Sequence, residues 1–425
     1  MVILSAPAHL GKLTNMRRPL DSPFSPGSDT VPQVWAGRAA QLSDWRDVLR
    51  PRRLGGIAER GRTILGEAGT GKSSLVRKIA ADAAQGGDWV TSQLRIPAGA
   101  DPLKRVAVAL IDLAREAGLA AAREERIKRL LGRVEAVALS GVSVSLREAA
   151  GPDPYTSFSE LLIEIGREAA RHKDRMVLLH VDEVQNITDD AVRSQLLIAL
   201  GDALVHEERR QVPGGVELSP ALPLSVYLTG LPEFQDTAGS RTGATFARRF
   251  QTTTLGALDE ADLALALHPF VDEGWVIADA HGHNQRIRMT PTACRALIDL
   301  SCGEPFLFQL AGERAWFAGV GDMITAEEVH EGWRSAAAEA ETHVQRVLAR
   351  LPAREERFLR AMAALDPHER TLTQIARQMG HAHASELGTT AQRLDLTRGI
   401  VERGRPYTFR HRAVEAFLTS SWPWV

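Results

Sequence analysis

Continuous apolar runs alternate with helical stretches over residues 35–257 of this chain. The apolar runs span 62–66, 89–94, 176–181 and 224–229, and a further strand is expected at 251–256. Short apolar runs without polar alternation are typical of parallel strands that are buried on both faces. The pattern therefore predicts an α/β fold with a parallel sheet flanked by helices.

The stretch 102–172, between the second and third runs, has apolar residues at three- and four-residue spacing, as amphipathic helices do. We expect a helical insertion in the α/β domain at this place. Packing against the rest of the domain is the default role for these helices, and a surface for a partner is the alternative.

The periodicity changes at about residue 258, after which we expect helices only as far as residue 350. Residues 351–425 predict three helices, two short strands and a closing helix. That order is typical of a winged helix-turn-helix. At the other end, residues 1–34 are rich in Pro, Ser and Gly, which predicts an extended lead-in rather than a packed element.

The composition is that of a soluble multidomain protein. The 425 residues are too many for one ordinary core, and 44% are apolar while 24% are charged. No run approaches the roughly 18–20 apolar residues that span a bilayer, and the N-terminus lacks the basic region of a secretory signal. Cys294 and Cys302 are too few for a disulfide framework or a zinc site. We therefore expect a cytoplasmic protein without membrane contact.

The segment 66–74 reads GEAGTGKSS and matches the G-x-x-x-x-G-K-[ST] pattern of a phosphate-binding loop. It follows a predicted strand and leads into a predicted helix, whose N-terminus favours anions. Lys72 would lie between the β- and γ-phosphates, and the Ser73 hydroxyl would be a Mg²⁺ ligand. The predicted nucleotide-binding residues of the loop are Gly66, Glu67, Ala68, Gly69, Thr70, Gly71, Lys72, Ser73 and Ser74.

Two adjacent acids, Asp182 and Glu183, end the apolar run MVLLHV. Asp182 would hold Mg²⁺, and Glu183 would orient and deprotonate the attacking water. Adjacent acids at a helix start are often only solvated caps, which is the alternative. With a phosphate loop in the same chain, the pair favours hydrolysis over transfer to another acceptor.

Two further positions could complete a site that senses the γ-phosphate. Thr229 ends the run LSVYLT, where a hydroxyl can reach the γ-phosphate or the attacking water; an ordinary strand end is the alternative. Arg248 and Arg249 precede the last predicted strand. An arginine there can reach the nucleotide of a neighbouring subunit, whereas a surface ion pair is the alternative in so arginine-rich a chain.

This ordered set of motifs resembles the AAA+ ATPases, in the branch of initiator-type origin-recognition ATPases, STAND-like ATPases and transposition regulators. The resemblance covers nearly the whole chain, and within that branch a group of bacterial ATP-binding proteins with a C-terminal winged helix is most similar. It implies a nucleotide-binding domain at 35–257, an α-helical lid at 258–350 and a winged helix at 351–425. It also implies that adenine lies near residues 24–38, beside Gly37 and Arg38, and that Arg249 is the arginine finger.

The lid departs from the initiator-type pattern. Those relatives often carry an arginine after a Gly-x-Pro-like turn, whereas Gly303-Glu304-Pro305 is followed here by Phe306, Leu307 and Phe308. We expect these three side chains to pack the lid core. Slow hydrolysis, or a switch resting in one nucleotide state, is then more plausible than a fast motor.

The predicted winged helix carries six arginines against two acids in residues 391–412, although the whole chain has a net charge of −2. The third helix of such a unit enters the DNA major groove and the wing follows phosphates. Arg393, Arg403 and Arg405 are the candidate nucleic-acid contacts. Winged helices also dock proteins, which is the alternative.

Taken together, the sequence predicts an ATPase that binds and slowly hydrolyses ATP·Mg²⁺ as a nucleotide-dependent switch. The predicted partners are double-stranded DNA and, on ATP binding, further copies of the chain. The alternative is a STAND-like signalling or defence ATPase whose ATP-driven oligomerisation docks a separate effector protein.

Overall fold

A parallel β-sheet forms the centre of the N-terminal half of the molecule. The computed structural model describes residues 16–27, 30–121, 123–140, 153–211, 217–234, 248–278 and 282–425. The strand order is β2-β4-β7-β1-β8, with β3 also pairing with β4, and every pair is parallel. The strands are β1 (Gly61–Leu65), β2 (Trp89–Val90), β3 (Leu94–Arg95), β4 (Val177–Asp182), β7 (Leu224–Gly230) and β8 (Phe250–Thr254). The predicted parallel sheet is confirmed.

The run predicted as one strand at 89–94 is divided into β2 and β3. Val90 pairs with Leu178 and Leu94 with Val181, so that three residues between these pairs on one side face two on the other. One extra residue must therefore bulge from the ladder. The hydroxyl of Thr91, within the break, accepts a hydrogen bond from the His180 N–H at 3.0 Å.

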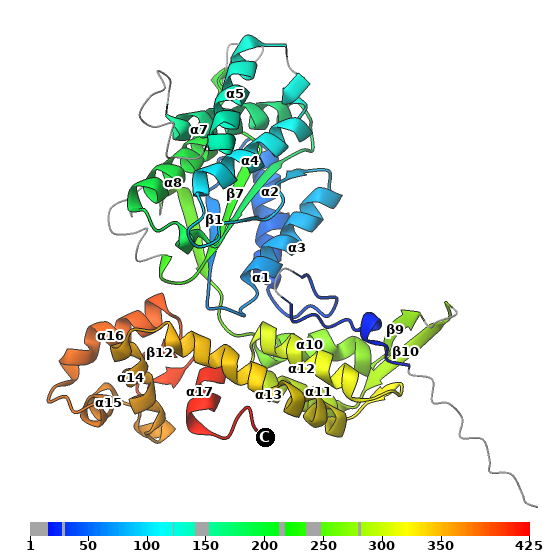
Figure 1. Cartoon of the computed structure of the whole chain (residues 1–425), viewed down its shortest axis with the longest axis vertical. Coiled ribbons are helices and arrows are strands. Elements are labelled where there is room, and N and C mark those ends of the chain that lie inside the picture. The colour runs from blue at the N-terminus through cyan, green and yellow to red at the C-terminus, as the bar shows by residue number, and fades with distance from the viewer. Residues whose placement is uncertain are drawn as a thin grey trace, which may run out of the picture.

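Helices cover both faces of the sheet (Figure 1). One face packs against α1 (Ala39–Ser43), α2 (Arg50–Leu54) and α3 (Lys72–Gln85), and the other against α4 (Pro102–Glu116), α7 (Pro154–Ala169) and α8 (Asp190–Val205). The helix α5 (Glu125–Ser140) packs on α4 and α7. Asp101, Asp153 and Asp189 cap α4, α7 and α8 by accepting backbone N–H groups at their first turns. The helical insertion is therefore part of the core of this domain. A small antiparallel pair, β5 (Arg210–Gln211) and β6 (Glu217–Leu218), follows α8.

The lead-in is extended, but the expectation that it does not pack is wrong for its described part. Phe24 is buried and stacks on Phe270, with ring centroids 5.6 Å apart. Arg17 is buried as well and forms an ion pair with Glu328 at 2.7 Å. These partners lie about 250–310 positions further along the chain, so local composition gave no sign of them.

The lid contains the helices α10 (Glu260–Val271), α11 (Pro291–Ser301), α12 (Pro305–Ala318) and α13 (Ala326–Ala349). It also contains a three-stranded sheet of β9 (Trp275–Ala278), β10 (Asn284–Met289) and β11 (Met323–Ile324), so the expectation of helices only is wrong. In β10, Ile287 and Met289 are buried while their neighbours face outward. The alternation extends over few residues and lies between two long helical patterns, so it was not recognised as a strand in the sequence.

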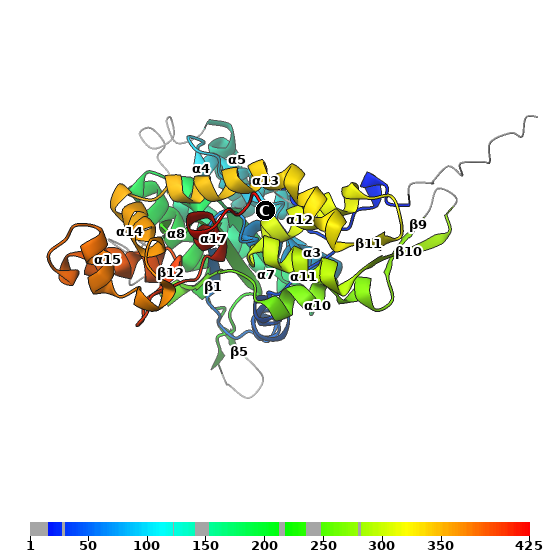
Figure 2. The same cartoon turned by 90° about the horizontal axis from the view of Figure 1, so that it is seen from below.

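The C-terminal unit has the order of elements of a winged helix. It consists of α14 (Ala353–Ala363), α15 (Leu372–Gln378), α16 (Gly388–Gln392), the antiparallel pair β12 (Val401–Glu402) and β13 (Thr408–Phe409), and α17 (Arg412–Thr419). It lies beside the lid, below the sheet domain in Figure 1, and Figure 2 shows the same row of helices from below. Trp422 packs against Trp333 of the lid, so the two units share one hydrophobic cluster. Within the described parts of the chain, no helix is both long and apolar enough to cross a membrane.

Candidate nucleotide site

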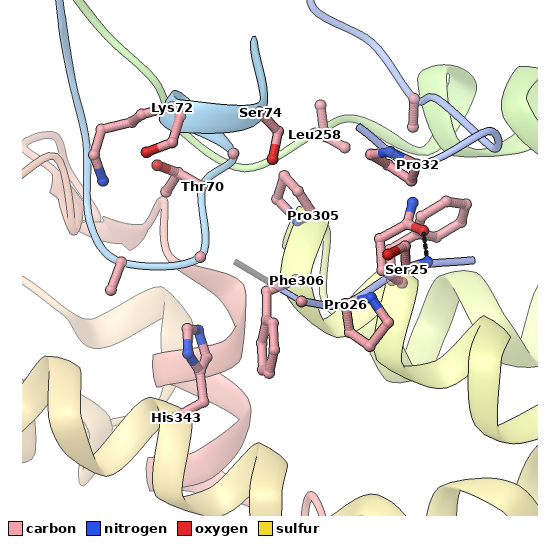
Figure 3. A pocket seen from close by; sticks show the side chains of 18 of the residues that line it. Ser25, Pro26, Pro32, Thr70, Lys72, Ser74, Leu258, Pro305, Phe306 and His343 are labelled. Atoms are coloured by element: carbon pink, nitrogen blue, oxygen red, sulfur yellow. Dashed lines mark hydrogen bonds between the residues drawn. The ribbon is translucent and has the colours of Figure 1, made fainter. Parts of the chain in front are cut away.

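A cavity of about 660 Å³ lies where the lead-in, the phosphate loop, the carboxyl end of the sheet and the lid meet. Figure 3 shows the loop residues Thr70 and Lys72 on one side of it and Phe306 and His343 of the lid on the other. Ligands of open α/β sheets bind at this end of the strands. The cavity-lining residues are Ser25, Pro26, Gly27, Pro32, Val34, Trp35, Ala36, Arg38, Ala68, Gly69, Thr70, Gly71, Lys72, Ser73, Ser74, Arg95, Glu183, Leu258, Pro305, Phe306, Phe308, Gln309, Glu339, Thr342, His343 and Arg346.

The phosphate loop joins β1 to α3 and takes a backbone path that requires glycine. Gly69 and Gly71 have φ of +84° and +83°, which side chains disfavour. Lys72 is the first residue of α3, and its ammonium donates to the carbonyl of Glu67 at 2.9 Å, within the loop itself. Burial lowers the pKa of Lys72, although the carboxylate of Glu183 opposes the shift. A bound phosphate would offer this buried ammonium the full negative charge that the Glu67 carbonyl lacks.

The acidic pair at the end of β4 and the phosphate loop meet at Asp182. The Ser73 hydroxyl donates to Asp182 Oδ2 at 2.9 Å, across 109 positions of sequence. Burial alone would raise the pKa of Asp182, but hydrogen bonds from Thr229, Ser73 and Gln93 help to lower it, which keeps the carboxylate charged. A hydroxyl and a carboxylate oxygen are the ligands that Mg²⁺ takes, so these two residues fit the predicted metal position.

Thr229 lies behind Asp182 rather than in the cavity. Its side chain is fully buried, and its hydroxyl donates to Asp182 Oδ1 while lying 3.2 Å from His180 Nε2. Burial lowers the pKa of His180 to about 4, so the ring is neutral and its Nε2–H can donate to Thr229. Both hydrogen-bonding functions of the hydroxyl are thus engaged. In this arrangement Thr229 orients the metal carboxylate, and does not face the γ-phosphate.

Glu183 reaches the cavity from a left-handed backbone conformation, with φ of +62°. The Gln185 amide donates to the Glu183 carboxylate, and Gln185 Oε1 accepts the Leu231 N–H at 3.0 Å. The carboxylate is therefore linked to the tip of β7. This placement agrees with a base for the attacking water, because the side chain is both in the cavity and oriented by a neighbour.

Arg249 directly precedes β8 and packs against α8, away from the residues that line the cavity. It forms an ion pair with Asp202 at 2.7 Å and donates to the Ile198 carbonyl at 3.1 Å. This contact is the surface ion pair that was the alternative to an arginine finger at the level of the sequence. A role for Arg249 in the site of a neighbouring subunit stays a prediction.

Gly37 and Arg38 connect the lead-in to the phosphate loop. Gly37 has φ of +63°, and an added Cβ would lie 2.6 Å from the Asp262 carboxylate. Arg38 donates to the carbonyls of Thr70 at 3.0 Å and Gly256 at 2.7 Å, and burial lowers its pKa to about 10. Because these donors are engaged by the backbone, Arg38 holds the wall of the cavity in place.

The lid places two of the three predicted core residues in the wall of the cavity. Leu307 and Phe308 are buried as expected, but Phe308 also lines the cavity, as does Phe306, which lies against His343 with ring centroids 4.7 Å apart. Gln309 donates to the Val34 carbonyl at 2.8 Å and accepts from the Ser25 N–H at 3.0 Å. The lead-in is therefore clamped to the lid, on the side of the cavity where the resemblance expects adenine.

A buried carboxylate joins the lid to the C-terminal unit. Glu304 is 2% exposed and lies 2.7 Å from His343 Nε2 and 2.9 Å from His411 Nδ1. Burial alone would raise its pKa, but the two histidines outweigh this and lower it to about 2. Arg350 likewise binds the carboxylate of Glu67 in the phosphate loop. None of these contacts was predicted, because each joins residues that lie far apart in the sequence: Glu304 and His343 within the lid, Glu304 and His411 across the lid and the C-terminal unit, and Glu67 and Arg350 across the phosphate loop and the lid.

Two of the three candidate DNA contacts are paired within the chain. Arg393 binds Glu355 at 2.9 Å, and Arg403 binds Asp395 at 2.8 Å. Arg405 is exposed between the strands of the wing, as predicted for a phosphate contact. Arg398 is 5% exposed and binds Glu355 and Glu233. Glu355 and Glu233, which lie outside residues 391–412, therefore neutralise part of the local charge excess read from that segment.

Comparisons with known proteins agree with this architecture. A family model of the AAA ATPase domain matches residues 34–212. The curated proteins contain no significant match to the chain. A Walker-type ATPase of Pyrococcus abyssi is similar in structure, with 14% identity, a TM-score of 0.54, and coverage of 90% of this chain and 96% of that one. The ORC2 protein of Aeropyrum pernix, in its ADPNP–ADP complexes, has 15% identity, a TM-score of 0.53, and coverage of 92% and 95%. At these identities the similarity shows the fold, over nearly the whole length.

Proposed function

We propose that residues 34–212, which match a family model of the AAA ATPase domain, form an ATPase domain of this kind, and that the protein binds ATP with Mg²⁺ and hydrolyses it slowly as a nucleotide-dependent switch. The observation that carries the proposal is the hydrogen bond between Ser73 and Asp182 beside the buried ammonium of Lys72. It joins the phosphate loop to the acidic strand end in one cavity. The similar Aeropyrum pernix protein is itself described with bound ADPNP and ADP, which supports this choice of nucleotide.

Each residue has a definite part in the proposed reaction. Lys72 neutralises the β- and γ-phosphates, and the amides of the glycine loop bind their oxygens. Ser73 and Asp182 would hold Mg²⁺, which supplies charge neutralisation on the phosphate oxygens. Glu183 accepts a proton from the attacking water, and its link to Gln185 keeps the carboxylate at the edge of the cavity.

The direct test is equilibrium binding of ATP in the presence of Mg²⁺ to the parent and to Lys72→Ala. We expect at least a roughly 100-fold loss of affinity, about 2.7 kcal/mol, because a buried charge–phosphate contact is removed. Lys104→Ala, on the exposed side of α4, is the matched control and should bind as the parent does. Equal ATP affinity of parent and Lys72→Ala would refute the site.

We propose further that the switch is transmitted to the C-terminal unit through Glu304 and Glu67. Glu304 contacts His411 of that unit, and Glu67 of the phosphate loop contacts Arg350 just before it. A change of the loop on nucleotide binding must alter these contacts, so the position of the unit depends on the nucleotide.

Two partners fit this switch, double-stranded DNA and a separate protein. Arg393 and Arg403 are paired with acids of the same chain, which favours protein docking as long as these ion pairs are intact. DNA binding would then require a nucleotide-dependent release of these arginines. Titration of duplex DNA at low salt, with and without a non-hydrolysable ATP analogue, separates the two: binding only with the analogue supports the DNA switch, and no binding in either state supports docking. The mass of the protein in the same solutions tests the predicted homo-oligomer.

A further inference from the structure

One face of the helix α13 forms part of the cavity wall on the lid side. Its cavity-lining residues are Glu339, Thr342, His343 and Arg346. Residues three and four positions apart lie on the same side of an α-helix, so these four side chains form one continuous face. The lid therefore brings charged groups to the cavity from a helix in which neither motif nor resemblance predicted a nucleotide contact.

This face is fixed to the phosphate loop at two points, on either side of Arg346. A Cβ added at Gly69 would lie 2.5 Å from His343 Cε1, so the ring lies directly against the loop, as Figure 3 shows. At the end of α13, Arg350 binds the carboxylate of Glu67. Position 346 is three residues after the first contact and four before the second. Its backbone is therefore held beside residues 67–69 of the loop.

Arg346 differs from both of these neighbours, because each of them is paired with a carboxylate. Arg350 binds Glu67, and His343 Nε2 lies 2.7 Å from Glu304. Among the residues that the structure describes, Arg346 has no hydrogen-bond or ion-pair partner, and its exposed side chain lines the cavity. A planar guanidinium with unengaged donors, placed beside a phosphate-binding loop, matches the geometry of phosphate oxygens.

The two contacts with the loop indicate which phosphate this arginine meets. The amides of such a loop surround the β-phosphate, whereas the γ-phosphate extends towards the metal and the attacking water. In this chain Asp182 and Glu183 mark the γ-phosphate end. The face of α13 is instead applied to the loop itself, at Glu67 and Gly69. Arg346 therefore faces the phosphate that ATP and ADP have in common.

We propose that Arg346 binds the β-phosphate from the lid, so that the lid closes on ATP and on ADP alike. This inference rests on the proposed function and adds to it a binding residue outside the motifs. A contact made equally in the ground state and in the transition state contributes to affinity but not to turnover at saturation. Recognition of the γ-phosphate then belongs to Lys72 and the metal site.

The test compares Arg346→Gln with the parent. With Mg²⁺ present, we expect a roughly 10-fold loss of affinity, about 1.4 kcal/mol, for a non-hydrolysable ATP analogue and for ADP alike. Hydrolysis at saturating ATP should stay within about two-fold of the parent. The midpoint of denaturant unfolding without nucleotide should be unchanged, because the side chain is exposed and unpaired among the described residues.

Two companion variants make the result specific. Arg334→Gln removes an exposed arginine of the same helix that is not among the cavity-lining residues, and it should leave every measurement unchanged. Arg346→Lys keeps the charge but not the planar donors, so it should recover part of the affinity for both nucleotides.

Three results would overturn the inference while leaving the proposed function intact. One is an Arg346→Gln variant that binds both nucleotides as the parent does. Another is a loss confined to the ATP analogue, which would assign the contact to the γ-phosphate. The third is a loss of affinity accompanied by a lower unfolding midpoint without nucleotide, which would make Arg346 a structural residue of the lid. A parent that binds neither nucleotide would instead overturn the proposed function, and the role of Arg346 with it.

Discussion

The nucleotide site and the winged-helix unit differ in how far their charged residues could be assigned in advance. In the nucleotide site, Lys72, Ser73 and Asp182 lie together as their motifs require. In the winged-helix unit, Arg393 and Arg403 were chosen for a local excess of positive charge. Arg403 binds Asp395, one of the two acids in that count, whereas Arg393 binds Glu355, which lies outside the counted segment. A motif specifies a backbone geometry, whereas a count of charges along the sequence omits every partner that folds in from elsewhere.

The largest expected effect concerns the nucleotide site, where the motifs predicted correctly which residues lie together. Glu183→Gln should bind ATP as the parent does but lower its hydrolysis roughly 100- to 1,000-fold, because the amide cannot accept the proton of the water. Binding and single-turnover hydrolysis are measured on the same preparation. Asp189→Asn, a change of the exposed cap of α8, is the control. Hydrolysis equal to that of the parent would remove Glu183 from the mechanism.

The buried carboxylate between the two regions should give the next largest effect, on stability. Glu304→Ala leaves His343 and His411 without their shared partner, and breaking a buried ion pair destabilises by about 3 kcal/mol. Denaturant unfolding at pH 6 measures this loss. Glu331→Ala, at an exposed position of α13, serves as its control and should change stability by less than about 0.5 kcal/mol.

The same contact makes a prediction about pH. The pKa of Glu304 is lowered to about 2, so its contribution to stability is present above about pH 4.5 and is lost as the pH falls towards 2. The pKa of His411 is raised: although burial opposes the charge, Glu304 outweighs it. The contribution of His411 is therefore present below about pH 6.5 and is lost as the pH rises through the raised value. The stability difference between parent and Glu304→Ala should be greatest between these limits, and a difference that grows above pH 8 would contradict the pairing.

Thr229 provides a further test within the nucleotide site. It lies at the strand end that the sequence predicted, but its hydroxyl donates to Asp182 and does not face the γ-phosphate. Thr229→Val keeps the shape but removes the hydrogen bond to Asp182. Outer partners of metal ligands typically contribute 10- to 100-fold, so we expect about ten times more Mg²⁺ for half-maximal hydrolysis, with ATP affinity at saturating Mg²⁺ little changed. An unchanged Mg²⁺ requirement with a lower maximal rate would favour direct contact of Thr229 with the phosphate or the water.

The smallest effects test the arginines of the wing. Arg405→Ala should weaken any DNA binding about two- to three-fold and reduce its salt dependence by about one counterion, since this side chain is exposed. Arg403→Ala should change binding less, because Asp395 already holds Arg403. If Arg403→Ala weakens DNA binding more than Arg405→Ala does, then DNA binds a state of the protein in which Arg403 is not paired with Asp395.

Much of the fold followed from sequence patterns that act locally. The apolar runs specified five strands of the sheet, and the spacing 66–74 specified a loop that needs glycine at Gly69 and Gly71. The strands β9 and β10 were missed, since two short runs between long helices carry too little periodicity to compete with the helical pattern. The lead-in was misjudged because its partners, Phe270 and Glu328, lie far along the chain.

The sequence alone determined the chemistry that requires a fixed spacing: a phosphate loop, an acid at a strand end, and the order of elements in the C-terminal unit. Tertiary structure decided which side chains face one another. It turned Thr229 towards Asp182, placed Arg249 against Asp202 of α8, and paired Arg393 with Glu355 of α14. The physical reason is that backbone geometry depends on neighbours a few residues away, whereas a side chain's electrostatic partner depends on how distant segments pack.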